Sequence, residues 1–196
     1  MRSEGPLDDT AFYRLVACAA PPDQPCAKPF IRWGKSVVTV GLVTRDPAYL
    51  GGKLKRAEAS VERAIQRLNA TGMAVQLNAS DDTPDIAIHL LDTPRGAQMQ
   101  GTGTPLDGLT LANALTRLTV RAGTIERAHI AFSNTMTRRQ YESVMLEEIM
   151  QALGLITDIE NPYYRSRSIL SQNADNRLKR LGEQDIMALR RHYPPA

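Results

Sequence analysis

Histidine and cysteine are scarce in this chain of 196 residues, and long apolar runs are absent. The three histidines, His89, His129 and His192, lie at least forty residues apart along the chain, and the cysteines are Cys18 and Cys26. Because these two residue types supply most transition-metal ligands, the scarcity excludes zinc fingers, zinc ribbons and iron–sulfur proteins. No apolar stretch approaches the ~20 residues that cross a bilayer. We therefore expect a soluble protein with no transmembrane segment.

The two cysteines flank a short segment that is rich in proline. Residues Ala19–Pro25 are too stiff to form a helix and few enough to close as a loop. A Cys18–Cys26 disulfide would stabilise the fold by roughly 2–3 kcal/mol and would indicate an oxidising compartment. The alternative is that the two cysteines are unrelated buried thiols. With the disulfide, we expect an extracytoplasmic protein (periplasmic, envelope-attached or secreted) whose export signal has been removed.

The basic side chains concentrate at the C-terminal end. The formal net charge is +3, and residues 161–196 hold seven basic against three acidic side chains, which leaves −1 for the rest. The basic residues are Arg165, Arg167, Arg177, Lys179, Arg180, Arg190 and Arg191. Aromatic residues are few and are not interleaved with them, so we expect no specific nucleic-acid binding. A basic surface that attaches to anionic lipid or nucleic acid through residues 161–196 stays open as one alternative function.

Hydrophobic periodicity predicts an α+β domain. Residues 1–30 form a proline-rich N-terminal segment, and residues 31–196 read as one domain. Apolar, β-branched runs predict strands, and apolar residues at three- and four-residue spacing predict helices. The expected strands are 37–43, 74–77, 85–91, 115–120 and 127–132, and the expected helices are 54–68, 137–154 and 182–193. This order favours helices packed on one mixed sheet. His89 and His129 fall on strands, where a lone histidine is usually a core residue.

The helix predicted from residue 137 carries a carboxylate, Glu148, on its apolar face. A carboxylate in that position must be paired or have a shifted pKa. Residues 147–158 resemble the active-site helix of zincin metallopeptidases, in which two metal ligands four residues apart enclose a glutamate that acts as general base. Glu147 stands at the first ligand position and Gln151 at the second. Glu148 is then the candidate general base.

The following turn and the C-terminal stretch extend the resemblance. Thr157 stands where a metzincin places its third ligand, and Asp158 comes one position later. Ser168, Ile169 and Leu170 are similar to the Ser-Ile-Met turn beneath the metzincin metal, and residues 181–193 resemble the final helix.

Together with residues 12–18 and 31–33, these motifs resemble an uncharacterised bacterial family, a domain of unknown function placed near the zincins. The resemblance implies that residues 31–196 form a zincin-like domain. Such a metzincin-like fold has a mixed, mostly parallel sheet, a long backing helix, an active-site-type helix and a C-terminal helix. The resemblance also implies an exported or envelope location, and it transfers no activity.

The donor types at the ligand positions disfavour zinc. Zinc prefers cysteine, histidine and carboxylate, whereas carboxylates with one amide suit Ca²⁺, Mg²⁺ or Mn²⁺. The cofactor is therefore unknown. We expect a non-catalytic binding or scaffolding module with a degenerate metal site, which receives a peptide or protein in a zincin-like cleft. One alternative is an active metallopeptidase or metallohydrolase in which Glu147, Gln151 and Asp158 hold a metal. In another, these side chains are purely structural.

Overall fold

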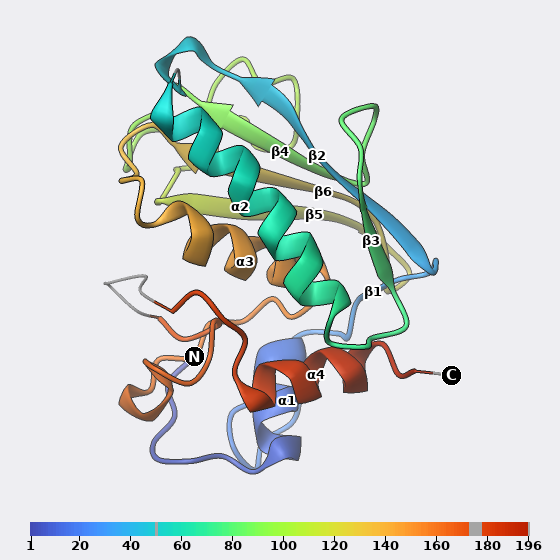
Figure 1. Cartoon of the computed structure of the whole chain (residues 1–196). Coiled ribbons are helices and arrows are strands. Elements are labelled where there is room, and N and C mark those ends of the chain that lie inside the picture. The colour runs from blue at the N-terminus through green and yellow to red at the C-terminus, as the bar shows by residue number, and fades with distance from the viewer. Residues whose placement is uncertain (50, 173–177, 196) are drawn as a thin grey trace.

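The computed structural model describes residues 1–49, 51–172 and 178–195, with six strands and four α-helices (Figure 1). The strands are β1 (Arg32–Trp33), β2 (Val37–Arg45), β3 (Gln76–Ala79), β4 (Ile86–Leu91), β5 (Ala114–Arg121) and β6 (Thr124–Ser133). The helices are α1 (Asp9–Cys18), α2 (Gly52–Asn69), α3 (Tyr141–Ala152) and α4 (Glu183–His192).

All six strands form one mostly parallel sheet. Its order is β1-β6-β4-β2-β3, with β5 paired to β6. Only the β5–β6 pair is antiparallel among these strands, and the two are joined at Ala122–Gly123. Both turn residues have positive φ, at 48° and 79°, as a two-residue hairpin turn requires. The predicted α+β class with a mostly parallel sheet is confirmed.

Successive side chains along the central strands point to opposite faces of the sheet. Ile86, Ile88 and Leu90 of β4 belong to the main core, on the face that α2 and α3 cover (Figure 1). Leu91 belongs instead to a small second cluster with apolar residues of the long β4–β5 connection. The helices α2 and α3 pack against each other, so the predicted backing and active-site-type helices share one face.

The helix α1 falls within the proline-rich residues 1–30, for which no helix is predicted from the sequence. Asp8 caps it by accepting a hydrogen bond from the Ala11 amide, and its apolar side packs on α4 below the sheet (Figure 1). The Cys18–Cys26 disulfide closes the loop that follows, as predicted. No helix in the described ranges is long and apolar enough to cross a membrane.

Helix α3 begins at Tyr141, four residues later than predicted from the apolar spacing. The side chain of Gln140 accepts hydrogen bonds from the backbone amide and the hydroxyl of Thr137, which form a turn before the helix. The two-residue strand β1 was not predicted because it is too short to show alternation.

Candidate functional site

The carboxylate of Glu148 is buried between α3 and the sheet. The hydroxyl of Thr116, on β5, donates a hydrogen bond of 2.6 Å to Glu148 Oε2. Burial raises the pKa of Glu148 to about 7, although this hydrogen bond acts in the opposite direction. Glu148 is therefore both paired and shifted, and it ties the helix to the outermost strand of the sheet.

Gln151 and Asp158 are bound to each other. The Gln151 amide nitrogen Nε2 donates to Asp158 Oδ1 at 2.7 Å. The chain can return to this position because Gly154 has φ +101°, and a Cβ there would lie 2.2 Å from the Ile31 carbonyl oxygen. The side chain at the second ligand-equivalent position therefore binds a carboxylate of the same chain.

Glu147 lies half-buried beside other carboxylates. Burial raises the pKa of Glu147 well above its ordinary value, and repulsion from Glu148, Asp158 and Asp185 raises it further. This grouping of like charges favours protonation or a nearby cation. Thr157, at the third ligand-equivalent position, is buried, and its hydroxyl makes no hydrogen bond within the described residues.

Ser168, Ile169 and Leu170, which were predicted to resemble a Ser-Ile-Met turn, form a buried turn that Asp185 holds in place. Ser168 Oγ donates to Asp185 Oδ1 at 2.6 Å, and the Ile169 amide donates to Oδ2 at 2.8 Å. The Gly182 amide also donates to Oδ2, so Asp185 ties the start of α4 to the turn. Burial raises the pKa of Asp185 to about 6, against these three hydrogen bonds.

Asp185 was not singled out from the sequence. The pattern that could have identified it is an acidic residue three positions after Gly182, at the start of the predicted C-terminal helix.

The three candidate metal ligands, Glu147, Gln151 and Asp158, do not fit zinc. They provide two carboxylates and one amide, with no histidine or cysteine, and the amide already donates to one of the carboxylates. Across the described ranges, no three His, Cys, Asp or Glu side chains form a group that could hold a metal ion.

The histidines lie elsewhere and are buried. His89 Nε2 and His129 Nδ1 are 3.1 Å apart across β4 and β6, although forty residues separate them in the sequence. Burial lowers the pKa of His89 to about 4, with the charge of His129 acting in the same direction. Burial likewise lowers the pKa of His192 to about 4. Burial also lowers the pKa of His129 below its ordinary value. All three histidines are therefore mainly neutral at physiological pH inside the fold.

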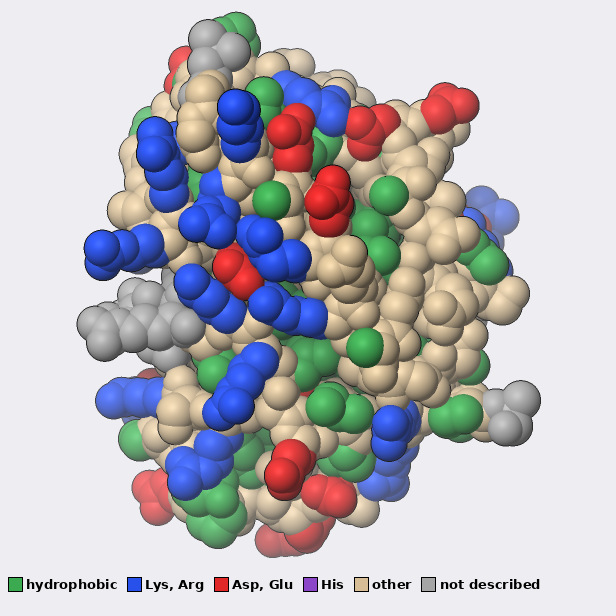
Figure 2. Space-filling model, viewed as in Figure 1, with side chains coloured by type: hydrophobic (Ala, Val, Ile, Leu, Met, Phe, Trp, Pro, Cys, Tyr) green, Lys and Arg blue, Asp and Glu red, His purple; other side chains and the backbone are tan. Residues whose placement is uncertain are grey.

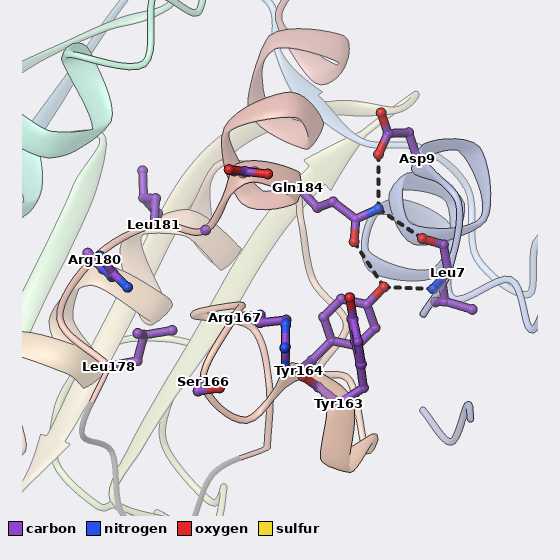
Figure 3. Close-up of a pocket in the computed structure, with 12 residues that line it drawn as sticks. Leu7, Asp9, Tyr163, Tyr164, Ser166, Arg167, Leu178, Arg180, Leu181 and Gln184 are labelled. Carbon is purple, nitrogen blue, oxygen red and sulfur yellow. Dashed lines mark hydrogen bonds between the residues drawn. The ribbon is translucent and has the colours of Figure 1, made fainter. Parts of the chain in front are cut away.

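A separate pocket of about 560 Å³ opens where the N-terminal and C-terminal segments meet (Figure 3). Tyr164 accepts a hydrogen bond from the Leu7 amide and donates one to Gln184 Oε1. The Gln184 amide donates to the Leu7 carbonyl and to Asp9. The Arg167 guanidinium stacks 4.2 Å above the Tyr163 ring at the edge of the pocket. These hydrogen bonds fasten residues 7–9 to the C-terminal part of the chain.

The sequence comparisons place most of the chain in one family. A family model described as a protein of unknown function, DUF2927, matches residues 22–196. The chain belongs to the DUF2927 family. The match confirms the family of unknown function that the motifs predicted, while the relation to zincin metallopeptidases stays a prediction. A search of the curated proteins found no match to this DUF2927 chain.

Proposed function

We propose that this DUF2927 protein is a non-catalytic binding module outside the cytoplasm, which receives an extended peptide segment of a partner protein along β5. The observation that carries the proposal is the contact between Thr116 and Glu148, because it joins the acidic part of α3 to a sheet edge. The proposed binding surface is the outer edge of β5 together with the half-buried Glu147.

The free edge of β5 supports a peptide ligand. Among the described residues, β5 pairs with β6 and with no other strand. An edge strand presents backbone amides and carbonyls that an added strand can bind, and this is a recurrent mode of peptide recognition. Arg117 and Val120 on β5 are exposed, which leaves room for side-chain contacts.

The charge of the site favours a peptide with a basic group. Glu147 experiences repulsion from Glu148, Asp158 and Asp185, and a lysine, arginine or amine nearby would relieve it. The hydrogen bond between Gln151 and Asp158 supports the absence of catalysis, because these side chains satisfy each other. The disulfide supports a location in an oxidising compartment.

Selection from a displayed peptide library, followed by hydrogen exchange, tests this function. We expect the disulfide-bonded protein to select peptides with a basic residue and to lose affinity about tenfold in Glu147→Gln. The matched control is Glu58→Gln, which replaces a partly exposed carboxylate on α2 that faces Arg45. Backbone amides of residues 114–121 should become protected on binding. Protection confined to the pocket of Figure 3 would overturn the assignment to β5.

An active metallohydrolase is the competing function, with Glu148 as its base. Stoichiometric zinc in the purified protein, lost in Glu147→Ala together with peptide cleavage, would establish it and refute the proposal.

Attachment through residues 161–196 has less support from the geometry. Arg190 donates to the Thr71 carbonyl, Arg191 donates to Thr10, and Lys179 faces Glu142. These basic side chains are therefore engaged at separate places. Arg177 lies outside the described residues.

A further inference from the structure

Four basic side chains surround one buried carboxylate where α2 and α3 meet. Glu142 is 9% exposed, and its oxygens lie within 4 Å of three arginines of α2 and one lysine. The basic residues are Arg56, Arg63, Arg67 and Lys179, and we call them and Glu142 the arginine cluster. Figure 2 shows basic side chains gathered around a single acidic one over this part of the molecule.

The single carboxylate leaves the cluster with three positive charges in excess. Arg67 Nη2 makes the close contact with Glu142 Oε1, at 2.8 Å, and Arg63 Nε is 3.5 Å from the same oxygen. Arg56 and Lys179 are each 3.8 Å from Oε2. Burial raises the pKa of Glu142, but the neighbouring cations outweigh this effect and lower the pKa below its ordinary value. The carboxylate is ionised and still cannot neutralise its neighbours.

Several buried donors of the cluster make no hydrogen bond. Arg63 Nε, Arg63 Nη2 and Arg67 Nη1 are buried and have no hydrogen-bond partner within the described residues. Buried donors without acceptors are costly, especially on charged groups. About a third of each of these two side chains is exposed, so the guanidinium groups can turn toward an acceptor at the surface.

The positive surface continues along α2 toward its N-terminus. Arg56 lies four residues after Gly52, and therefore on the same side of the helix. The Arg138 guanidinium covers Gly52, where a Cβ would lie 2.5 Å from its central carbon. The nearby acid Glu58 faces Arg45.

We propose that the arginine cluster binds a phosphate group of an anionic ligand. A tetrahedral dianion accepts hydrogen bonds from several directions and compensates more of the excess charge than a second carboxylate would. Glu142 is the positioning residue, because it gathers the three arginines before the ligand arrives. The site lies on α2 and α3, uses no residue of the peptide surface along β5, and does not depend on the proposed function.

Titration of the whole protein with inorganic phosphate at constant ionic strength tests the site. We expect Arg63→Gln/Arg67→Gln to weaken phosphate binding about tenfold or more, because two charged donors are lost. Arg2→Gln/Arg121→Gln removes the same charge from two exposed ion pairs and should bind as the wild type does. Glu142→Gln should weaken phosphate binding, because the neutral amide no longer gathers the three arginines.

A second arm identifies the source of the phosphate. Vesicles of phosphatidylcholine are compared with vesicles that also contain about 20 mol % phosphatidic acid. Binding of inorganic phosphate without vesicle binding assigns a soluble phosphate ligand, and vesicle binding that needs phosphatidic acid and both arginines assigns a lipid head group. Equal phosphate binding by wild type and Arg63→Gln/Arg67→Gln, or no binding in either arm, overturns the proposal.

If the double variant does not fold, Arg56→Gln on the rim of the cluster replaces it. Its affinity for phosphate should fall about threefold, and an unchanged affinity would count against the site.

Discussion

Replacing Glu148 with glutamine should stabilise the protein at pH 8 and leave its stability nearly unchanged at pH 4. The side chain is buried, and burial raises its pKa from the ordinary 4.5 to about 7. In the unfolded chain the carboxyl ionises at its ordinary pKa, so the folded state loses stability as the pH rises from about 4.5 to about 7. Glutamine cannot ionise and removes that loss.

The size of the effect follows from the two pKa values. The difference between 4.5 and about 7 corresponds to about 3 kcal/mol, because one pKa unit is worth ~1.4 kcal/mol. Below pH 4.5 the side chain at position 148 is mainly neutral in both the wild type and the Glu148→Gln variant. Glutamine also retains a carbonyl oxygen that accepts the hydrogen bond of Thr116, so the packing between α3 and β5 is preserved.

Urea unfolding of both proteins at pH 4 and pH 8, with the disulfide intact, measures the effect. Glu126→Gln serves as the control, because that carboxylate belongs to an exposed ion pair with Arg121 and should contribute at most about 1 kcal/mol. A Glu148→Gln protein that is less stable than wild type at pH 8, or a difference that is equal at both pH values, would refute the reasoning.

Three further changes test other parts of the fold. Asp185→Ala should destabilise the protein by about 3 kcal/mol in urea, because two backbone amides and a serine hydroxyl lose their buried acceptor. Gly154→Ala should cost about 2 kcal/mol or more by the same measurement, since φ is +101° and the new methyl group would meet the Ile31 carbonyl. Replacing Cys18 and Cys26 by serine should lower the free energy of unfolding by about 2.5 kcal/mol, from the loss of loop closure.

Each of these changes has an outcome that contradicts its reasoning. A loss below about 1 kcal/mol for Asp185→Ala would mean that water replaces the carboxylate easily. An unchanged free energy of unfolding in urea for Gly154→Ala would show that the turn can move away from Ile31. Equal stability of the disulfide-bonded and serine forms would show that the loop is already ordered without the bond.

Local patterns were enough for most secondary structure. The predicted helices 54–68 and 182–193 correspond to α2 and α4 because amphipathic periodicity and the glycines near their ends are local signals. The helix α1 was not predicted, because it is short and precedes a proline-rich loop. Its stability comes from packing on α4 and from the Asp8 cap.

The candidate site could be predicted only in part. The apolar stripe indicated that Glu148 is buried, since burial follows from periodicity. Its partner Thr116 is 32 residues away and lies on another element, so only strand placement brings the two together. The same holds for Asp185 and Ser168, and for the arginine cluster, which joins α2, α3 and Lys179.

The sequence by itself determined the α+β class and the short disulfide loop, because both rest on residues close together in the chain. It also identified the family of unknown function, from motifs spread along the chain. Tertiary structure alone decided which polar and charged side chains meet. It placed His89 beside His129, joined Gln151 to Asp158, and gathered three arginines around Glu142. Hydrogen bonds and ion pairs act over a few ångströms, and only the folded chain sets those separations.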